Sequence, residues 1–225
     1  MAGELKDKVA VITGGSRGLG YAIAQAYIAA GAAVVIAGRS QSTLDKAVGS
    51  LLNGGGRASG FAVDVGSLDQ VEALADHAVG TFGRIDVWVN NAGMGAPYGP
   101  TQQVAPAAFE QVVATNILGT YYGSHAALRR FLAQGSGKLI NLLGRGWQGK
   151  PVLWQNAYAS SKAWVHSFTL GLAAETKQGG VPGIGIFAFS PGMVLTDMLT
   201  DISVVEGSED KLSSFPTVVR MWAKP

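Results

Sequence analysis

The chain has 225 residues, of which 48% are hydrophobic and 14% are charged, which excludes a disordered chain and predicts a single α/β domain over residues 1–225. The formal net charge is +2 and no run of Lys or Arg stands out, which excludes a basic surface for nucleic acid or membranes. Cysteine is absent and the three histidines are scattered, so we expect neither a disulfide nor a metal site.

The first residues carry charges before a short apolar run, which glycines and Arg17 interrupt. A signal peptide or a membrane span would need a longer apolar stretch. We therefore expect a cytoplasmic protein.

Short β-branched runs alternate with longer helical patterns along the chain, as in βαβ units. The expected strands are 9–13, 33–37, 58–63, 87–90, 138–143 and 183–189. The expected helices are 18–30, 41–52, 67–82, 107–133 and 156–178. Each strand is apolar along nearly its whole length, as in sheets that helices cover on both faces. The sequence therefore predicts a Rossmann-type doubly wound α/β/α fold with a mostly parallel sheet of six strands.

Beyond residue 189 the pattern loosens into a mixture of Met, Leu, Val, Gly and Pro. We expect residues 192–220 to form a partly helical lid over a pocket, with an ordinary surface loop as the alternative. If it is a lid, it is the segment that selects the substrate.

A glycine-rich turn, "TGGSRGLG" at 13–20, joins the first strand to the first helix. Gly14, Gly18 and Gly20 would let backbone N–H groups and the helix dipole approach a pyrophosphate closely. A merely tight connection is the alternative for the turn taken alone.

The second strand ends at Gly38 and Arg39, where a carboxylate for the ribose 2′-hydroxyl would be expected. The first acid downstream is Asp45, inside the next expected helix. Arg39, together with Arg17 of the glycine turn, can instead donate to a 2′-phosphate. NADP is therefore expected in preference to NAD, unless both arginines are solvated surface residues.

Tyr158 and Lys162 lie four residues apart in "YASSK", so on a helix they share one face. The pair suits proton transfer, although a solvated helix face is the common alternative for such a pair by itself.

With these motifs the chain resembles the short-chain dehydrogenase/reductase family in its single-domain form. The resemblance runs from about residue 8 to about residue 196 and involves six motifs in the order that the family has them. They are "TGGSRGLG" (13–20), Asp64 with Val65, "NNAG" (90–93), Asn116, "YASSK" (158–162) and "PGMVLT" (191–196).

The resemblance implies that Tyr158 is the general acid or base, and that Lys162 and an oxidised nicotinamide lower the pKa of Tyr158. It implies that Asn116 kinks its helix and holds a water that passes protons to Lys162. "NNAG" would also stabilise the central sheet. The cofactor-binding residues that it implies are Gly14, Ser16, Arg17, Gly18, Leu19, Gly20, Arg39, Asp64, Val65, Asn90, Ala92, Gly93, Tyr158, Lys162, Pro191, Gly192, Val194 and Thr196.

The chain departs from the family at the end of the fifth strand. Relatives have a sequence such as "INISS" there, whose last serine hydrogen-bonds the substrate oxygen, whereas this chain has Leu142, Leu143 and Gly144. Losing such a donor costs on the order of 10² to 10³ in rate. A water in the vacant space, the Gly144 N–H group, or the side chains of Arg145, Gln148 and Gln155 could replace it, and Gly144→Ser is expected to raise activity if the pocket tolerates it.

A second departure is that members usually continue into a seventh strand, which the pattern here lacks. The strand at 183–189 would then leave an apolar sheet edge unpaired, which a partner subunit could cover. The helices at 107–133 and 156–178 suit a homodimer, with a homotetramer as the other option.

The expected function is that of an NADP-dependent oxidoreductase that interconverts a carbonyl and a secondary alcohol on a small, mainly apolar substrate. One alternative is an NADP(H)-binding sensor or scaffold that has lost catalysis, and another is a reductase of C=C or C=N bonds. The side chains that could line an apolar pocket, or pack in the core instead, are Met94, Trp147, Trp154, Met193 and Met198.

Overall fold

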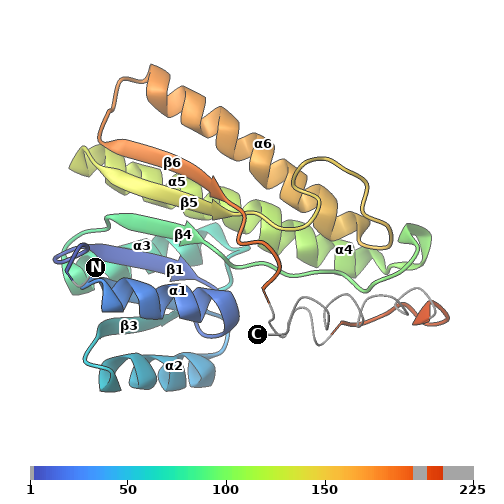
Figure 1. The fold of residues 1–225 in the computed structure, drawn as a ribbon, viewed down its shortest axis with the longest axis horizontal. Coiled ribbons are helices and arrows are strands. Elements are labelled where there is room, and N and C mark those ends of the chain that lie inside the picture. Colours follow the sequence, from blue (N-terminus) through green and yellow to red (C-terminus); the bar gives the residue numbers. More distant parts are fainter. Residues whose placement is uncertain (1–2, 195–201, 210–225) are drawn as a thin grey trace.

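The computed structural model describes residues 3–194 and 202–209. Within them one sheet has six strands, all paired in parallel, in the order β3-β2-β1-β4-β5-β6 (Figure 1). The strands are β1 (Val9–Thr13), β2 (Ala33–Gly38), β3 (Arg57–Ala62), β4 (Val87–Asn90), β5 (Gly137–Leu142) and β6 (Ile184–Phe189). The Rossmann-type fold is confirmed, and each strand lies within one residue of its expected bounds. Strand order reverses between β1 and β4, the place where such sheets open a crevice for a ligand.

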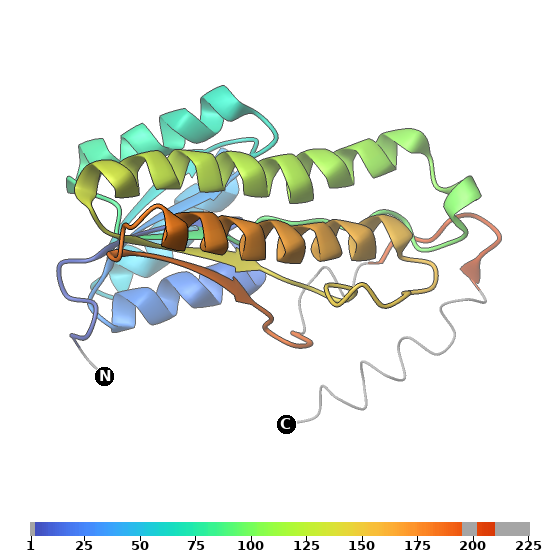
Figure 2. The same ribbon diagram turned by 90° about the horizontal axis from the view of Figure 1, so that it is seen from above.

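Helices cover both faces of the sheet. Figure 2 shows α3, α5 and α6 on one face and α1 on the other. The helices are α1 (Gly18–Ala29), α2 (Gln41–Asn53), α3 (Leu68–Phe82), α4 (Pro106–Val112), α5 (Gly119–Gln134) and α6 (Asn156–Gln178). The Ser40 hydroxyl caps α2 by accepting the Thr43 N–H at 3.3 Å, and left-handed glycines at 83 and 135 end α3 and α5.

The hydrophobic core has two parts, one on each face of the sheet. On one face, Val11, Val35, Trp88 and Leu139 pack against residues of α3 and α5. On the other face, strand residues such as Ile12 pack against α1 and α2. Strands buried on both sides explain the almost continuous apolar runs in the sequence.

The helical stretch expected at 107–133 is present at 106–134, but its winding changes within it. A π-helical segment, Val113–Leu118, separates α4 from α5. Asn116 lies in this segment, fully buried, and its side chain bonds to the loop after β4. A widened turn of this kind often marks a functional position inside a helix.

Strand β6 forms one edge of the sheet in the part of the chain that the structure describes. Its Phe187 and Phe189 are half-exposed, at 50% and 51%. Of the expected lid, residues 192–194 and 202–209 are described, and the remainder lies outside the described residues. The helices within residues 3–194 and 202–209 include none with the length and apolar character of a membrane span.

Candidate active site

The glycine turn after β1 has the backbone that its sequence suggests. Gly14 and Gly18 adopt left-handed conformations, with φ of 64° and 55°. A Cβ at Gly20 would overlap the Gly14 carbonyl oxygen, so α1 begins directly against the turn. The turn is thus a narrow cradle lined by backbone, which fits the phosphates of a dinucleotide.

Asn91 locks this turn to the loop after β4. Its Nδ2 donates to the carbonyl oxygens of Thr13, at 2.9 Å, and Gly14, at 3.1 Å. In return, Thr13 Oγ1 accepts the N–H groups of Asn91 and Ala92, each at 3.1 Å. Sequence reasoning named neither Asn91 nor Thr13 as a site residue, although both lie within the two quoted motifs at the ends of adjacent strands.

The arginines expected at the cofactor lie beside the turn. A Cβ at Gly38 would be 3.2 Å from Ser16 Oγ, so the end of β2 approaches the glycine turn closely. Arg17 and Arg39 follow these two residues in the sequence, and both are exposed. The end of β2, at Gly38 and Arg39, carries no acidic residue. Leu19, in the first turn of α1, is partly buried against the core.

Asp64 and Val65 form the loop after β3. Asp64 Oδ1 accepts the Gly66 N–H at 2.9 Å, and the Asp64 N–H donates to Gln70 Oε1 at 2.8 Å. Val65 is buried beneath Gly119, where a Cβ would lie 2.7 Å from it. The exposed Asp64 carboxylate is therefore held in a defined position on this side of the crevice.

The side chain of Asn90 points into the core, so only the backbone of this residue remains for the expected contact with a cofactor. It is 4% exposed, and its Oδ1 accepts the Trp88 Nε1–H at 2.8 Å. Its Nδ2 lies within hydrogen-bonding distance of Ser124 Oγ and, at 2.8 Å, of Asn141 Oδ1. Asn141 in turn donates to Thr169 Oγ1 on α6 at 3.0 Å. This buried chain of side chains ties β4 and β5 to α5 and α6, in agreement with the expected support of the sheet.

Lys162 and Tyr158 share one face at the start of α6. Lys162 is 5% exposed, and its Nζ donates to the Leu142 carbonyl oxygen at 3.0 Å and lies 5.7 Å from the centre of the Tyr158 ring. Burial disfavours the ammonium and lowers the pKa of Lys162 to about 8. Burial also raises the pKa of the Tyr158 phenol. The expected lowering of the Tyr158 pKa, which combines Lys162 with an oxidised nicotinamide, stays a prediction.

Asn116 joins the loop after β4 to α6. Its Nδ2 lies 2.9 Å from both the Met94 carbonyl and Ser161 Oγ, and its Oδ1 accepts the Met94 N–H at 2.9 Å. Ser161 Oγ also donates to the Tyr158 carbonyl at 2.7 Å. A Cβ at Gly93 would be 3.5 Å from both Asn116 Oδ1 and Lys162 Nζ. Asn116 and Lys162 thus lie on either side of Gly93, and Ser161, which sequence reasoning set aside, links Asn116 to the backbone of Tyr158.

Gly144 faces the Tyr158 hydroxyl. A Cβ at position 144 would overlap that oxygen and lie 2.9 Å from Tyr158 Cζ. The space expected to hold a water in place of a serine is therefore filled by the phenol, and a serine would not fit without displacing the ring. Arg145 and Gln148 are exposed. The expectation of vacant room at Gly144 is wrong.

The loop after β6 carries the remaining expected cofactor residues. Pro191 and Val194 are half-buried, and Gly192 has a φ of 75°. Thr196 and Met198 lie outside the described residues.

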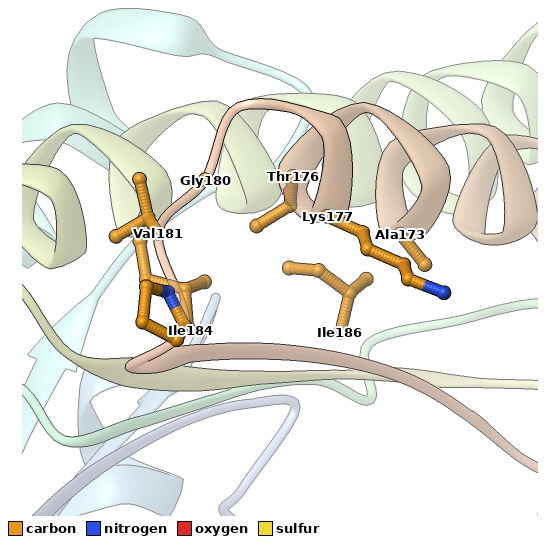
Figure 3. Close-up of a pocket in the computed structure, with 8 residues that line it drawn as sticks. Ala173, Thr176, Lys177, Gly180, Val181, Ile184 and Ile186 are labelled. Carbon is orange, nitrogen blue, oxygen red and sulfur yellow. The ribbon is translucent and has the colours of Figure 1, made fainter.

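A separate groove of about 470 Å³ lies between α6 and β6 (Figure 3). Its lining includes Thr176 and Lys177, near the end of α6, and Ile184, at the start of β6. Lys177 is about 28 Å along the helix from Tyr158, at 1.5 Å per residue. The groove is therefore distinct from the Tyr158 site. No cluster of His, Cys, Asp or Glu among the described residues could hold a metal ion.

Comparison with known proteins gives a consistent result. The short chain dehydrogenase family matches residues 8–206. The oxidoreductase YxnA of Bacillus subtilis is 34% identical over 194 residues, which are 86% of this chain and 54% of that protein. The chain thus spans about half the length of that curated relative.

Two solved structures have the same fold. A metagenomic short-chain oxidoreductase in complex with NADP has a TM-score of 0.78 and 32% identity, with 85% of each chain covered. A short chain dehydrogenase/reductase from Burkholderia phymatum in complex with NAD has a TM-score of 0.86 and 26% identity, covering 96% of this chain and 79% of that one.

Proposed function

The chain belongs to the short-chain dehydrogenase family, and from this premise we propose that it is an NADP-dependent oxidoreductase that interconverts a carbonyl and a secondary alcohol. The observation that carries the proposal is the cluster of Tyr158, Lys162 and Asn116 at the ends of β4 and β5, beside the glycine turn after β1. That position is the crevice in which doubly wound sheets bind ligands.

The roles divide between cofactor and protein. A bound nicotinamide supplies or accepts the hydride. Tyr158 gives a proton to the substrate oxygen in reduction and takes one in oxidation. Lys162 places a positive charge beside the phenol and so favours the phenolate, while the Leu142 carbonyl fixes its ammonium. Asn116 holds the Met94 loop against α6 and so keeps Lys162 in place.

Gly144 stands, in this proposal, where relatives carry the active-site serine. The substrate oxygen then meets Tyr158 without a second side-chain hydroxyl opposite. Because one preorganised donor is worth about 3 to 4 kcal/mol, we expect slow turnover of simple ketones. The same geometry would also suit an NADP(H)-binding sensor or a reductase of C=C or C=N bonds. The experiment below distinguishes these two alternatives from a carbonyl reductase.

The preference for NADP rests on Arg17 and Arg39. Both are exposed beside the cradle, and the end of β2 carries no carboxylate that would repel a 2′-phosphate. The relatives include proteins solved with NADP and with NAD, so the family alone does not decide the preference.

We further propose that residues 1–225 form one domain, that residues 192–220 serve as its lid, and that the chain pairs through α5 and α6. The outer faces of these two helices carry a cluster of aromatic rings. Phe168 stacks on Trp164, with ring centres 4.9 Å apart, and contacts Tyr121, which is 47% exposed.

The test is a fluorescence titration with NADPH, followed by oxidation of NADPH with a panel of aldehydes, ketones, imines and activated alkenes. Turnover of a carbonyl, lowered at least about 10²-fold by Tyr158→Phe with NADPH binding retained, supports the proposal. Tyr122→Phe, which removes a phenol on α5, is the matched control. Binding without turnover of any compound would identify a sensor, and turnover of imines or alkenes alone would identify the third reading.

A further inference from the structure

Three loops meet at the carboxyl edge of the sheet, at a point that the proposed chemistry does not use. They follow β4, β5 and β6, and their described parts include residues 98–103, residue 154 and residues 202–209. Gly99 is the residue at which all three touch. We call Gly99, Trp154 and Val205 the Gly99 junction.

The loop after β6 is fastened to the loop after β4 by backbone bonds. The Tyr98 N–H donates to the Ser203 carbonyl at 2.9 Å, and the Val205 N–H donates to the Tyr98 carbonyl at 3.0 Å. Ser208, only 1% exposed, adds a hydrogen bond from its hydroxyl to Gln103 Oε1 at 3.4 Å. Residues 202–209 are thus seated on residues 98–103 as a short parallel bridge.

The loop after β4 is also held, on its other side, to the residues at the start of α6. The Gly99 N–H donates to the Trp154 carbonyl at 3.0 Å, and Asn156 Nδ2 donates to Thr101 Oγ1 at 3.4 Å. Trp154 has a φ of 65°, in the left-handed region that a bulky residue rarely adopts. Such a conformation persists only where its surroundings hold it, and Tyr158 follows one helical turn later.

Gly99 has no room for a side chain. A Cβ there would lie 2.8 Å from both Cβ and Cγ2 of Val205. The φ of Gly99 is not positive, so an alanine would be free of backbone strain and would act only by pushing Val205 away. Gly95, in the same loop, has no atom within 4 Å of the corresponding position. The chain therefore offers a matched pair of glycines, one packed and one open.

We propose that Gly99 is a positioning residue for substrate binding: by lacking a side chain it seats residues 202–209 against the loop that also holds Trp154, next to Tyr158. The loops at the carboxyl ends of β4, β5 and β6 surround the place where a substrate would meet Tyr158. Unseating one of them would loosen substrate binding but leave the glycine turn and the dinucleotide untouched. The inference rests on the proposed oxidoreductase function, while the junction itself can be tested without it.

The first experiment is hydrogen exchange on the cofactor-free protein, with Gly99→Ala, Gly95→Ala and the double variant Gly99→Ala/Val205→Gly. The amides of Tyr98, Gly99 and Val205 are expected to exchange about tenfold faster in Gly99→Ala, to be unchanged in Gly95→Ala, and to recover in the double variant, because removing the Val205 side chain restores the space. Unchanged exchange in Gly99→Ala would overturn the junction whatever the enzyme does.

The second experiment is steady-state kinetics on a carbonyl that the wild type turns over. Gly99→Ala is expected to raise KM about tenfold with kcat changed less than about threefold, as for a lost ground-state contact, and the double variant to restore KM. NADPH affinity should stay as in the wild type. Faster exchange with an unchanged KM would overturn the role in substrate binding, whereas a wild type without turnover would count against the proposed function and leave the exchange result valid.

Discussion

The Tyr158 hydroxyl lies where a Cβ at position 144 would be. Both sides of this contact are fixed. The Leu143 N–H donates to the Phe189 carbonyl at 2.8 Å, which pins the chain just before Gly144 to β6. On the other side, Lys162 bonds to the Leu142 carbonyl and holds α6 against the end of β5. The residue at position 144 therefore determines whether the Tyr158 ring can occupy its place, and only glycine leaves room for the hydroxyl.

Adding a side chain at position 144 should impair the site, contrary to the sequence-based expectation that a serine would improve it. Gly144→Ser and Gly144→Ala both introduce the Cβ that overlaps the phenol, so kcat should fall about 10- to 100-fold in each, since small displacements of a reacting group have effects of this size. Steady-state turnover of the two variants measures this. A Gly144→Ser enzyme faster than the wild type would show that the ring moves aside freely and that a hydroxyl was indeed the missing group.

Arg39 should decide between the two dinucleotides. Arg39→Asp replaces a donor for the 2′-phosphate with a group that repels it, so the Kd for NADPH should rise at least about tenfold while that for NADH stays within about twofold. Fluorescence titration with both cofactors is the measurement. Arg57→Asp makes the same charge change at the amino end of β3 and should alter neither. If Arg39→Asp weakens the binding of NADPH and of NADH equally, this arginine does not bind the 2′-phosphate.

Burial of Lys162 should make stability depend on pH in a defined window. Its pKa is about 8 in the folded chain and about 10.5 when exposed, so between these values the unfolded chain binds more protons. The free energy of unfolding should therefore rise as pH increases, by about 2 kcal/mol from about pH 7.5 to about pH 9.5. Above about pH 10 the raised pKa of Tyr158 acts in the opposite direction, because the unfolded phenol loses its proton first.

Urea unfolding across that window measures the effect. Lys162→Met removes the titrating group and should abolish the rise, whereas Lys46→Met, at an exposed lysine of α2, should retain it. An equal slope in the wild type and in Lys162→Met would assign the pH dependence to other groups.

Asn91 should matter for the cofactor although it was not predicted to. Asn91→Ala removes both bonds to the carbonyls of Thr13 and Gly14, and so frees the glycine turn. The Kd for NADPH should rise about tenfold, the equivalent of one lost hydrogen bond of about 1.4 kcal/mol. Asn53→Ala, at an exposed asparagine at the end of α2, is the control. If Asn91→Ala binds NADPH as tightly as the wild type, the glycine turn keeps its shape without the two hydrogen bonds from Asn91.

The outer face of α6 should form the contact between subunits. Leu170 is 56% exposed on this helix, so Leu170→Glu should leave the fold intact and shift the chain from dimer to monomer in size-exclusion chromatography with light scattering. Leu52→Glu, at a 48% exposed leucine of α2, should not. If Leu170→Glu elutes as the wild type does, α6 is not the contact.

The sheet was predictable because its strands are covered on both faces. A strand such as Val9–Thr13 then forms an unbroken apolar run between turn residues, and a helix, Gly18–Ala29, separates it from the next strand. The resemblance implied a kink at Asn116, but the π-helical form of Val113–Leu118 was not predictable, because Asn116 bonds to Met94 and Ser161, which are distant in the sequence.

The site was predictable as a set of residue types but not as contacts. Tyr158, Lys162 and the glycine turn were identified from six motifs in the family's order rather than from any one spacing. The inward orientation of Asn90, the clamp by Asn91 and the overlap at Gly144 depend on which atoms meet across strands, and sequence periodicity carries no such information. Burial raises the pKa of Tyr158 in the chain alone, while the expected lowering by Lys162 and an oxidised nicotinamide stays a prediction.

The buried chain from Asn90 through Asn141 to Thr169 also bears on how this sequence can change over evolutionary time. No buried side-chain polar atom among the described residues lacks a partner, so a single replacement in the chain leaves the neighbouring group stranded in the core. Replacing both members of a pair also removes the stranded group, so the double replacement lowers stability less than the two single replacements together would suggest. Amino-acid substitutions at these positions should therefore occur in pairs, so that a change at one residue accompanies a change at its hydrogen-bond partner.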